Sequence, residues 1–204
     1  GAYMHACTHH RVCTSECVHP GCAHASYALV AIHSHTGTLL YLVSGKARPG
    51  DASDLCRLLG VHVDSVDIER DPSHDLVDQH AWEDVIAAIR SGYYSAVLMS
   101  PPCSTFSMVR CRPGDPRPLR GEDPKQIYGL PGLAPTAQER VRVGTLLALR
   151  CAEAARICIR MDIPWLIETP LVRSGVPSIF KLPEWLPISK HALVEVPLAH
   201  AGKG

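Results

Sequence analysis

The fold of this chain is decided around the stretch SAVLMSPPC, residues 95–103. Its apolar run, Ala96 to Met99, is typical of a buried strand in a parallel sheet. Two prolines then end the strand, because a proline has no backbone N–H to donate to a neighbouring strand. Cys103 follows at once. The sequence therefore places a thiol just beyond the carboxyl end of a buried strand.

The segments before this strand alternate between strand and helix patterns. We expect strands at 27–32, 38–43, 61–68 and 95–100, and helices at 51–59 and 82–89. Asp51 or Ser53 can cap the first of these helices, and Gly60 ends it. Strands and helices that alternate at this spacing build a parallel sheet with helices on both faces, so the predicted fold class is α/β.

The segments after Cys103 begin with a long loop, 108–137, that is rich in proline and glycine. A long helix is expected from there to about Met161. Its predicted start is a capping box, in which Thr136 caps the first turn and Glu139 stands three residues later. A short strand is predicted next, at Ile163–Ile167, and it ends in Glu168-Thr169-Pro170.

Composition places broad limits on the class of protein. The chain has 204 residues, of which 46% are hydrophobic and 20% charged, which indicates a globular domain. Lys and Arg together number 20 and Asp and Glu also number 20, so only a local basic patch would predict nucleic-acid binding. No apolar run reaches the length of about 18 residues that spans a membrane. With no signal-peptide pattern, we expect an intracellular protein without a membrane partner.

The first 26 residues are rich in cysteine and histidine. Between residues 7 and 24 they contain Cys7, Cys13, Cys17, Cys22, His9, His10, His19 and His24. Zinc binds four such ligands in a tetrahedron and can fold a segment that has no core. We therefore predict structural zinc with the four cysteines as the simplest ligand set and histidines as replacements. A metal-free tail and disulfides are the alternatives. The predicted division is a Cys/His-rich segment, 1–26, and a core, 27–204.

Candidate functional residues follow the predicted strands of the core. Ligands of an open parallel sheet gather outside the carboxyl ends of the strands. There the chain delivers a glycine-bearing turn at 44–50, Asp67 with Glu69, the Pro-Pro-Cys stretch ending at Cys103, and Glu168. We expect these residues to lie close together at one edge of the sheet.

Taken together, these residues resemble the cytosine-C5 DNA methyltransferase family over roughly residues 38–185. PPCSTFS, residues 101–107, resembles the Pro-Cys nucleophile motif of that family, and Glu168-Thr169-Pro170 resembles its Glu-Asn-Val or Glu-Asn-Pro motif. The turn from Ser44 to Asp51 looks like a variant of its glycine-rich S-adenosylmethionine loop. The resemblance implies the cofactor-binding residues Ser44, Gly45, Gly50, Asp51, Asp67, Asp78 and Pro101, with Asp67 at the ribose and Asp78 at the adenine.

The resemblance also implies a Rossmann-like S-adenosylmethionine-dependent methyltransferase sheet and a covalent mechanism. The thiolate of Cys103 adds to C6 of cytosine, and Glu168 assists at N3. The expected partner is DNA whose target cytosine is flipped out of the duplex. Basic residues of the 108–137 loop are then expected to contact phosphates: Arg110, Arg112, Arg117, Arg120 and Lys125.

Some motifs of the family have no counterpart after Glu168. We recognise no Gln-x-Arg-x-Arg strand and no variable target-recognition region, and expect a partner chain to supply that region. Two other functions stay open. One is a non-catalytic, zinc-bearing relic of the fold that binds nucleic acid or protein. The other is a methyltransferase for amino groups, in which Tyr, Phe or Trp rather than a cysteine such as Cys103 follows the Pro-Pro turn.

Overall fold

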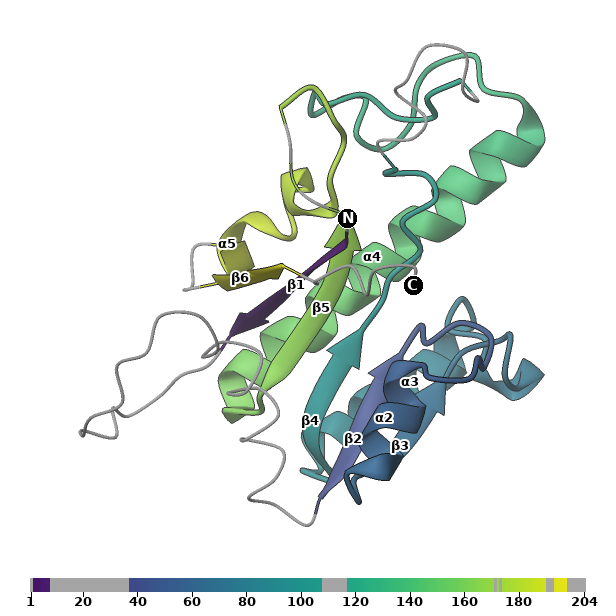
Figure 1. The fold of residues 1–204 in the computed structure, drawn as a ribbon. Coiled ribbons are helices and arrows are strands. Elements are labelled where there is room, and N and C mark those ends of the chain that lie inside the picture. The colour runs from purple at the N-terminus through teal and green to yellow at the C-terminus, as the bar shows by residue number, and fades with distance from the viewer. Residues whose placement is uncertain are drawn as a thin grey trace, which may run out of the picture.

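The computed structural model describes residues 2–7, 37–107, 117–170, 172, 174–189 and 193–197. Within this part of the chain, six strands form one sheet in the order β3-β2-β4-β5-β1-β6 (Figure 1). The strands are β1 (Ala2–Cys7), β2 (Thr38–Leu42), β3 (His62–Val66), β4 (Tyr94–Met99), β5 (Trp165–Pro170) and β6 (Leu193–Pro197). Strands β3, β2, β4 and β5 are parallel, whereas β1 pairs antiparallel with both β5 and β6. The α/β class predicted from the sequence is confirmed.

Helices cover both faces of the sheet, as the alternating pattern predicted. They are α2 (Ala52–Leu58), α3 (Gln79–Arg90), α4 (Pro135–Met161) and α5 (Leu186–Ser189), with 3-10 helices η1 (Pro72–His74) and η3 (Ile179–Lys181). Helices α3 and α4 pack on the face that buries Leu40, Val97 and Ile167, and α2 packs on the face that contains Leu39 and Leu98. Alternate residues of each strand thus serve separate apolar clusters.

The predicted elements match the structure to within a few residues, which is the usual uncertainty of element ends. Asp51 caps α2 and accepts a hydrogen bond from the N–H of Asp54, as one of the two predicted caps. The strand expected at 27–32 lies outside the described residues. A strand at Ala2–Cys7 was not expected, and it lies between β5 and β6 in the sheet.

Two predicted ends are wrong. Helix α4 begins at Pro135, with Ala134 at the capping position and no side-chain cap. Proline suits the first helical position because its missing N–H needs no partner there, and Glu139 pairs with Arg142 instead of closing a capping box. Strand β5 continues through Pro170 rather than ending at Ile167, because β1 pairs with it along its whole length.

The order of the strands creates a switch point at the carboxyl edge of the sheet. From β2 the chain moves outward to β3, and it then returns to place β4 on the other side of β2. The connections after β2 and β4 therefore leave in opposite directions, and this is the position at which ligands commonly bind in open α/β sheets. Helix α4 extends beyond this edge (Figure 1). None of the helices in the described ranges is long and apolar enough to cross a membrane.

Candidate active site

The loop after β4 presents Cys103 at the switch point. The backbone N–H of Ser100 donates to the carbonyl of Leu42 at 3.0 Å, which makes the last link between β4 and β2. Pro101 is buried, whereas Cys103 is exposed, and a turn closes from the N–H of Phe106 to the carbonyl of Cys103. The chain thus leaves the sheet through a stiff proline segment and turns with the thiol at its outer side.

The negative charge of Glu168 acts on the thiol of Cys103, although Glu168 is not among the residues that line the Cys103 pocket. Cys103 lines a small pocket together with Phe106, Thr169 and Ile179. Partial burial of the thiol raises its pKa, and the negative charge of Glu168 raises that pKa further. The sequence predicted this pair from two separate motifs, and the structure places them on neighbouring strands, Cys103 after β4 and Glu168 within β5. The raised pKa keeps the thiol protonated at neutral pH.

Glu168 is half-buried in β5, and one of its oxygens is held by a hydrogen bond. Ser100 Oγ donates to Glu168 Oε2 at 3.1 Å, and the hydroxyl of Tyr41 lies 3.2 Å from Ser100 Oγ. Sequence reasoning missed Tyr41 and Ser100. The only feature of the sequence that could have indicated them is the alternation of side chains between the two faces of a strand. This alternation places Tyr41, Ser100 and Glu168 on the same face of the sheet.

The turn after β2 is strained at its first residue. Val43 has a φ of 54°, a left-handed conformation that is unusual for a β-branched residue. Gly45 follows with a φ of 66°, which glycine adopts without cost. Ser44 between them is buried, and its hydroxyl has no hydrogen-bond partner in the described part of the chain. Strain and an unpaired buried hydroxyl are features of a ligand-binding turn rather than of a simple connection.

Charged side chains hold this turn in place. Asp67 is buried, and its two oxygens accept from the N–H groups of Gly45 at 2.9 Å and Glu69 at 2.8 Å. Arg70 donates from Nε to the carbonyl of Gly45 at 2.9 Å and from Nη2 to Asp51 Oδ2 at 2.7 Å. Sequence reasoning missed Arg70, because nothing in the pattern of a turn indicates which arginine will bind it.

The charges of both halves of the site act on one hydroxyl. Burial raises the pKa of Tyr41, and the carboxylates of Glu168 and Asp51 raise it further, while the nearby charge of Arg70 lowers it. The charges of Glu168 in β5 and of Asp51 at the end of the turn therefore both reach the Tyr41 hydroxyl, which lies between them in the order of the strands.

The residues around the turn fit a bound S-adenosylmethionine in part. The free hydroxyl of Ser44 and the left-handed Gly45 suit a cofactor turn. Asp67 keeps a spare lone pair on each oxygen, since each accepts only one hydrogen bond. Gly50 is exposed, and its N–H donates to Asp54, so it serves the start of α2.

Asp78 has a structural role. It caps α3 by accepting from the N–H of Ala81 at 3.0 Å, and this hydrogen bond lowers the pKa of Asp78. Its backbone carbonyl accepts from Arg150 of α4 at 2.8 Å. These contacts dock the start of α3 on α4, and none of them brings Asp78 to the Cys103–Glu168 pair.

Arg120 is a buried residue of the loop after Cys103, with 2% of its surface exposed. It donates to Thr105 Oγ1, to Thr145 Oγ1 and to the carbonyls of Ile127 and Val141. Its guanidinium lies 3.9 Å from the centre of the Phe106 ring. The expectation that Arg120 contacts phosphate is therefore wrong, because all three of its nitrogens are used inside the protein. It joins the nucleophile loop to α4.

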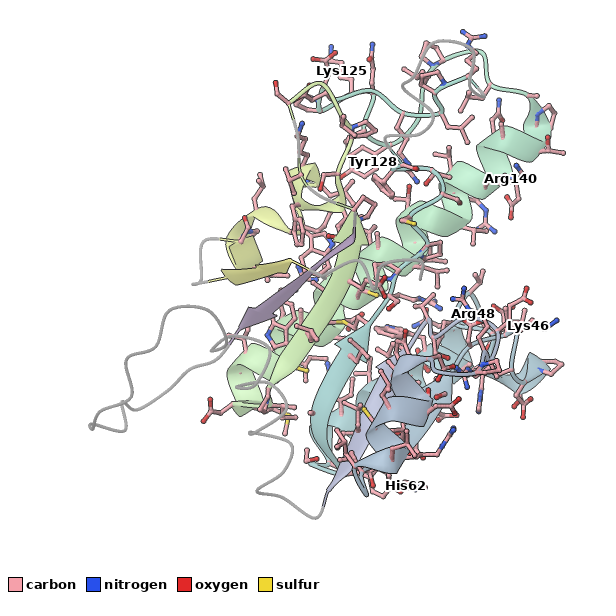
Figure 2. All side chains as sticks on the ribbon, viewed as in Figure 1. Lys46, Arg48, His62, Lys125, Tyr128 and Arg140 are labelled. Atoms are coloured by element: carbon pink, nitrogen blue, oxygen red, sulfur yellow. The ribbon has the colours of Figure 1, made fainter. Side chains whose placement is uncertain are left out.

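Exposed cations gather at the carboxyl edge of the sheet. Figure 2 shows Lys46 and Arg48 on the turn after β2, and Lys125 and Arg140 beyond the strands, whereas His62 lies at the opposite edge. None of these four cations has an ion-pair partner within the described ranges. Two of the arginines expected at phosphates, Arg110 and Arg112, lie outside those ranges.

The predicted zinc ligands fall largely outside the described residues. Cys13, Cys17 and Cys22 are not described, and Cys7 ends strand β1. Within the part of the chain that the structure covers, no group of three or more His, Cys, Asp or Glu residues is arranged to hold a metal ion. Zinc binding stays a prediction from the sequence.

Fold and site together define an α/β protein with an exposed thiol just after β4 and a half-buried carboxylate in the neighbouring β5. The chain matches no protein-family model, no curated protein and no solved structure. Its chemistry is therefore argued from its own residues.

Proposed function

We propose that this chain is the catalytic core of an S-adenosylmethionine-dependent DNA (cytosine-5-)-methyltransferase with a Rossmann-like sheet. The observation that carries the proposal is the position of Cys103 and Glu168. An exposed thiol follows the end of β4 and lines a small pocket, a half-buried carboxylate stands in the adjacent β5, and a turn with a left-handed Val43 follows β2 on the other side of β4. A structural cysteine is usually buried and far from such a partner.

The residue types suit addition to a pyrimidine. Cys103 as thiolate forms a bond to C6 of cytosine, and the electron pair of the C5=C6 bond shifts so that C5 becomes nucleophilic. Glu168 next to the ring places a proton or hydrogen bond at N3, where negative charge develops. C5 would then form a bond to the methyl group as the bond from that methyl to the sulfonium sulfur breaks. A base removes the C5 proton, the electron pair of the C5–H bond restores the C5=C6 double bond, and the C6–sulfur bond breaks to free Cys103 as thiolate.

Ser44, Gly45 and Asp67 are the residues that would hold S-adenosylmethionine. When bound, this cofactor supplies the methyl group. The hydroxyl of Ser44 and the carboxylate of Asp67 offer hydrogen bonds to a polar ligand from the floor of the turn. Arg70 keeps the turn in register by binding both of its ends, at Gly45 and Asp51.

The exposed cations support DNA as the substrate. Lys46 and Arg48 lie together on the turn after β2, Lys125 lies beyond the strands, and Arg140 lies on α4 (Figure 2). Phosphate contacts of this kind position a duplex but do not read its sequence. A target base must leave the stack to reach a thiol at a sheet edge. We further propose that a partner chain supplies the target-recognition region.

The proposal is tested by covalent trapping. The protein is incubated with S-adenosylmethionine and a mixed-sequence duplex that contains 5-fluorocytosine, whose fluorine blocks release of the enzyme. We expect a denaturant-resistant adduct with the parent chain and with Cys56→Ser, and none with Cys103→Ser. An adduct that survives Cys103→Ser would contradict the assignment of the nucleophile.

Calorimetry with S-adenosylmethionine distinguishes the proposed enzyme from the main alternative, a non-catalytic relic of the same fold. Heat of binding without any adduct on DNA would favour a non-catalytic relic of the fold. The absence of binding at high protein concentration would contradict the cofactor assignment of the turn at 44–51.

A further inference from the structure

Three side chains form a continuous hydrogen-bond chain across the switch point. Tyr41 belongs to β2, Ser100 follows β4, and Glu168 belongs to β5. Ser100 Oγ donates to Glu168 Oε2 at 3.1 Å. Because a hydroxyl has a single hydrogen, Ser100 has none left for Tyr41. The Tyr41 hydroxyl, 3.2 Å from Ser100 Oγ, must therefore be the donor of that hydrogen bond. The hydrogen bonds therefore all run in one direction, with Tyr41 donating to Ser100 and Ser100 donating to the carboxylate of Glu168.

The backbone fixes the positions of all three residues. Tyr41 pairs with Leu98 of β4 in the parallel register, and the N–H of Ser100 donates to Leu42. Glu168 follows Ile167, which is paired with Met99. Side chains that stand on paired strands are held more precisely than side chains on loops. The hydrogen-bond chain is therefore part of the sheet rather than of the mobile surface.

Burial makes these hydrogen bonds selective for one arrangement. Tyr41 is 7% exposed, and Ser100 and Glu168 are half-buried. A hydrogen bond to a carboxylate in such surroundings is about twice as strong as one between neutral groups. It fixes Oε2 of Glu168, while Oε1 accepts no hydrogen bond from the described residues. The carboxyl group thus keeps one oxygen in the sheet and one free for a ligand.

We propose that Tyr41 and Ser100 are positioning residues that orient the carboxyl group of Glu168 toward the substrate base. This inference rests on the proposed function, because it assigns Glu168 a substrate. The two hydroxyls do not touch the base. They act through Glu168, by preventing its carboxyl group from rotating away from the ring position that it serves.

The first experiment compares methyl transfer by Ser100→Ala, Ser100→Thr and Tyr41→Phe with the parent chain. A misplaced catalytic group costs up to about 100-fold in rate. We expect kcat to fall at least about tenfold in Ser100→Ala and about threefold in Tyr41→Phe, with KM for DNA unchanged. Ser100→Thr keeps a hydroxyl and should restore kcat to within about threefold of the parent. Ser95→Ala is the matched control, because Ser95 donates to Thr38 at the opposite end of β4.

The second experiment does not require turnover. The rate at which iodoacetamide alkylates Cys103 at pH 8 reports the charge that Glu168 places near the thiol. Without the Ser100 hydroxyl, the full carboxylate charge acts on the thiol, so Ser100→Ala should slow alkylation about twofold or more. In a Glu168→Gln background, the same Ser100→Ala change should have no effect. This non-additivity is expected only if the two residues interact.

The outcomes separate the inference from the proposed function. If the parent chain shows neither methyl transfer nor a DNA adduct, the proposed function is overturned. The alkylation rates of the parent chain, Ser100→Ala, Glu168→Gln and the double variant would still decide whether Ser100 acts on Glu168. The inference is overturned if Ser100→Ala behaves like Ser95→Ala, if Ser100→Thr fails to restore activity, or if Ser100→Ala and Glu168→Gln have additive effects on alkylation.

Discussion

The reactive pair, Cys103 and Glu168, is coupled through charge. Burial and the carboxylate of Glu168 both raise the pKa of the Cys103 thiol, so the thiol stays protonated near neutral pH. A group with a raised pKa becomes thiolate only as the pH rises through that value. The negative charge of Glu168 therefore opposes formation of the Cys103 thiolate.

This coupling predicts that the Cys103 thiol reacts faster with an alkylating reagent in Glu168→Gln than in the parent chain. Removing the negative charge should lower the pKa of Cys103, and alkylation by iodoacetamide at pH 7.5 should accelerate by about threefold or more. The pH at half-maximal alkylation should move downward, and mass spectrometry of the modified peptide confirms the site. Glu69→Gln, which removes an exposed acid at the end of β3, should leave the rate unchanged. An unaltered pH profile in Glu168→Gln would show that the two groups do not interact.

At the scale of elements, the loop after β4 depends on helix α4. Gly144 lets the side chains of Thr105 and Arg120 approach the backbone of α4 closely. A Cβ at this position would lie 3.0 Å from Thr105 Oγ1 and 3.3 Å from Arg120 Nη2. Burial lowers the pKa of Arg120 to about 10, so its guanidinium is still charged at neutral pH. Its fixed fork of donors joins Thr105, beside Cys103, to the carbonyl of Val141 in the helix. The position of the thiol is therefore tied to the helix.

Arg120→Lys is predicted to loosen this connection. Lysine keeps the charge but lacks the planar fork, so buried acceptors such as the carbonyls of Ile127 and Val141 lose their donors. We expect the free energy of unfolding to fall by about 2 kcal/mol or more in a urea titration. Arg140→Lys, an exposed change on the same helix, should cost less than about 0.5 kcal/mol. Equal stability of the two variants would contradict the role of Arg120.

At the scale of the whole molecule, the distribution of charge matters more than its sum. The formal net charge is zero. Even so, Lys46, Arg48, Lys125 and Arg140 stand unpaired at the carboxyl edge, in the part of the chain that the structure describes. Exposed acids such as Glu69, Asp71 and Asp123 stand among these cations, so a polyanion would bind through the cations that project farthest from them. Under the proposed function, these cations would bring a duplex to the side of the molecule that presents Cys103.

This arrangement predicts how DNA binding depends on salt. Each cation that meets a phosphate adds about 0.9 to the slope of log K against log salt concentration. Changing Lys46 and Arg140 to glutamine should therefore reduce the slope by about 2 in a fluorescence titration. Arg90 and Arg160 precede the starts of β4 and β5, at the other edge, and the same change there should leave the slope unaltered. Equal effects at both edges would contradict a basic DNA-binding edge.

Much of the fold could be predicted because its signals are local. The buried run from Ala96 to Met99, the cap at Asp51 and the turns between elements each depend on neighbouring residues. The strand at Ala2–Cys7 could not be predicted, because its place depends on pairing with β5, which is remote in sequence. The start of α4 was predicted wrongly, because two local signals competed: Pro135 at the first helical position prevailed over the capping box at Thr136.

For the site, the sequence by itself determined that Cys103 stands just after a buried strand and that Glu168 belongs to the next strand of the parallel sheet. The runs of apolar residues that form these strands are local signals, and parallel pairing carries their carboxyl ends to one edge. Only the tertiary structure decided the groups that orient them. Arg120 became a buried bridge and Ser100 a donor to Glu168. A hydrogen bond between distant segments depends on distances of a few tenths of an ångström, and packing sets those distances.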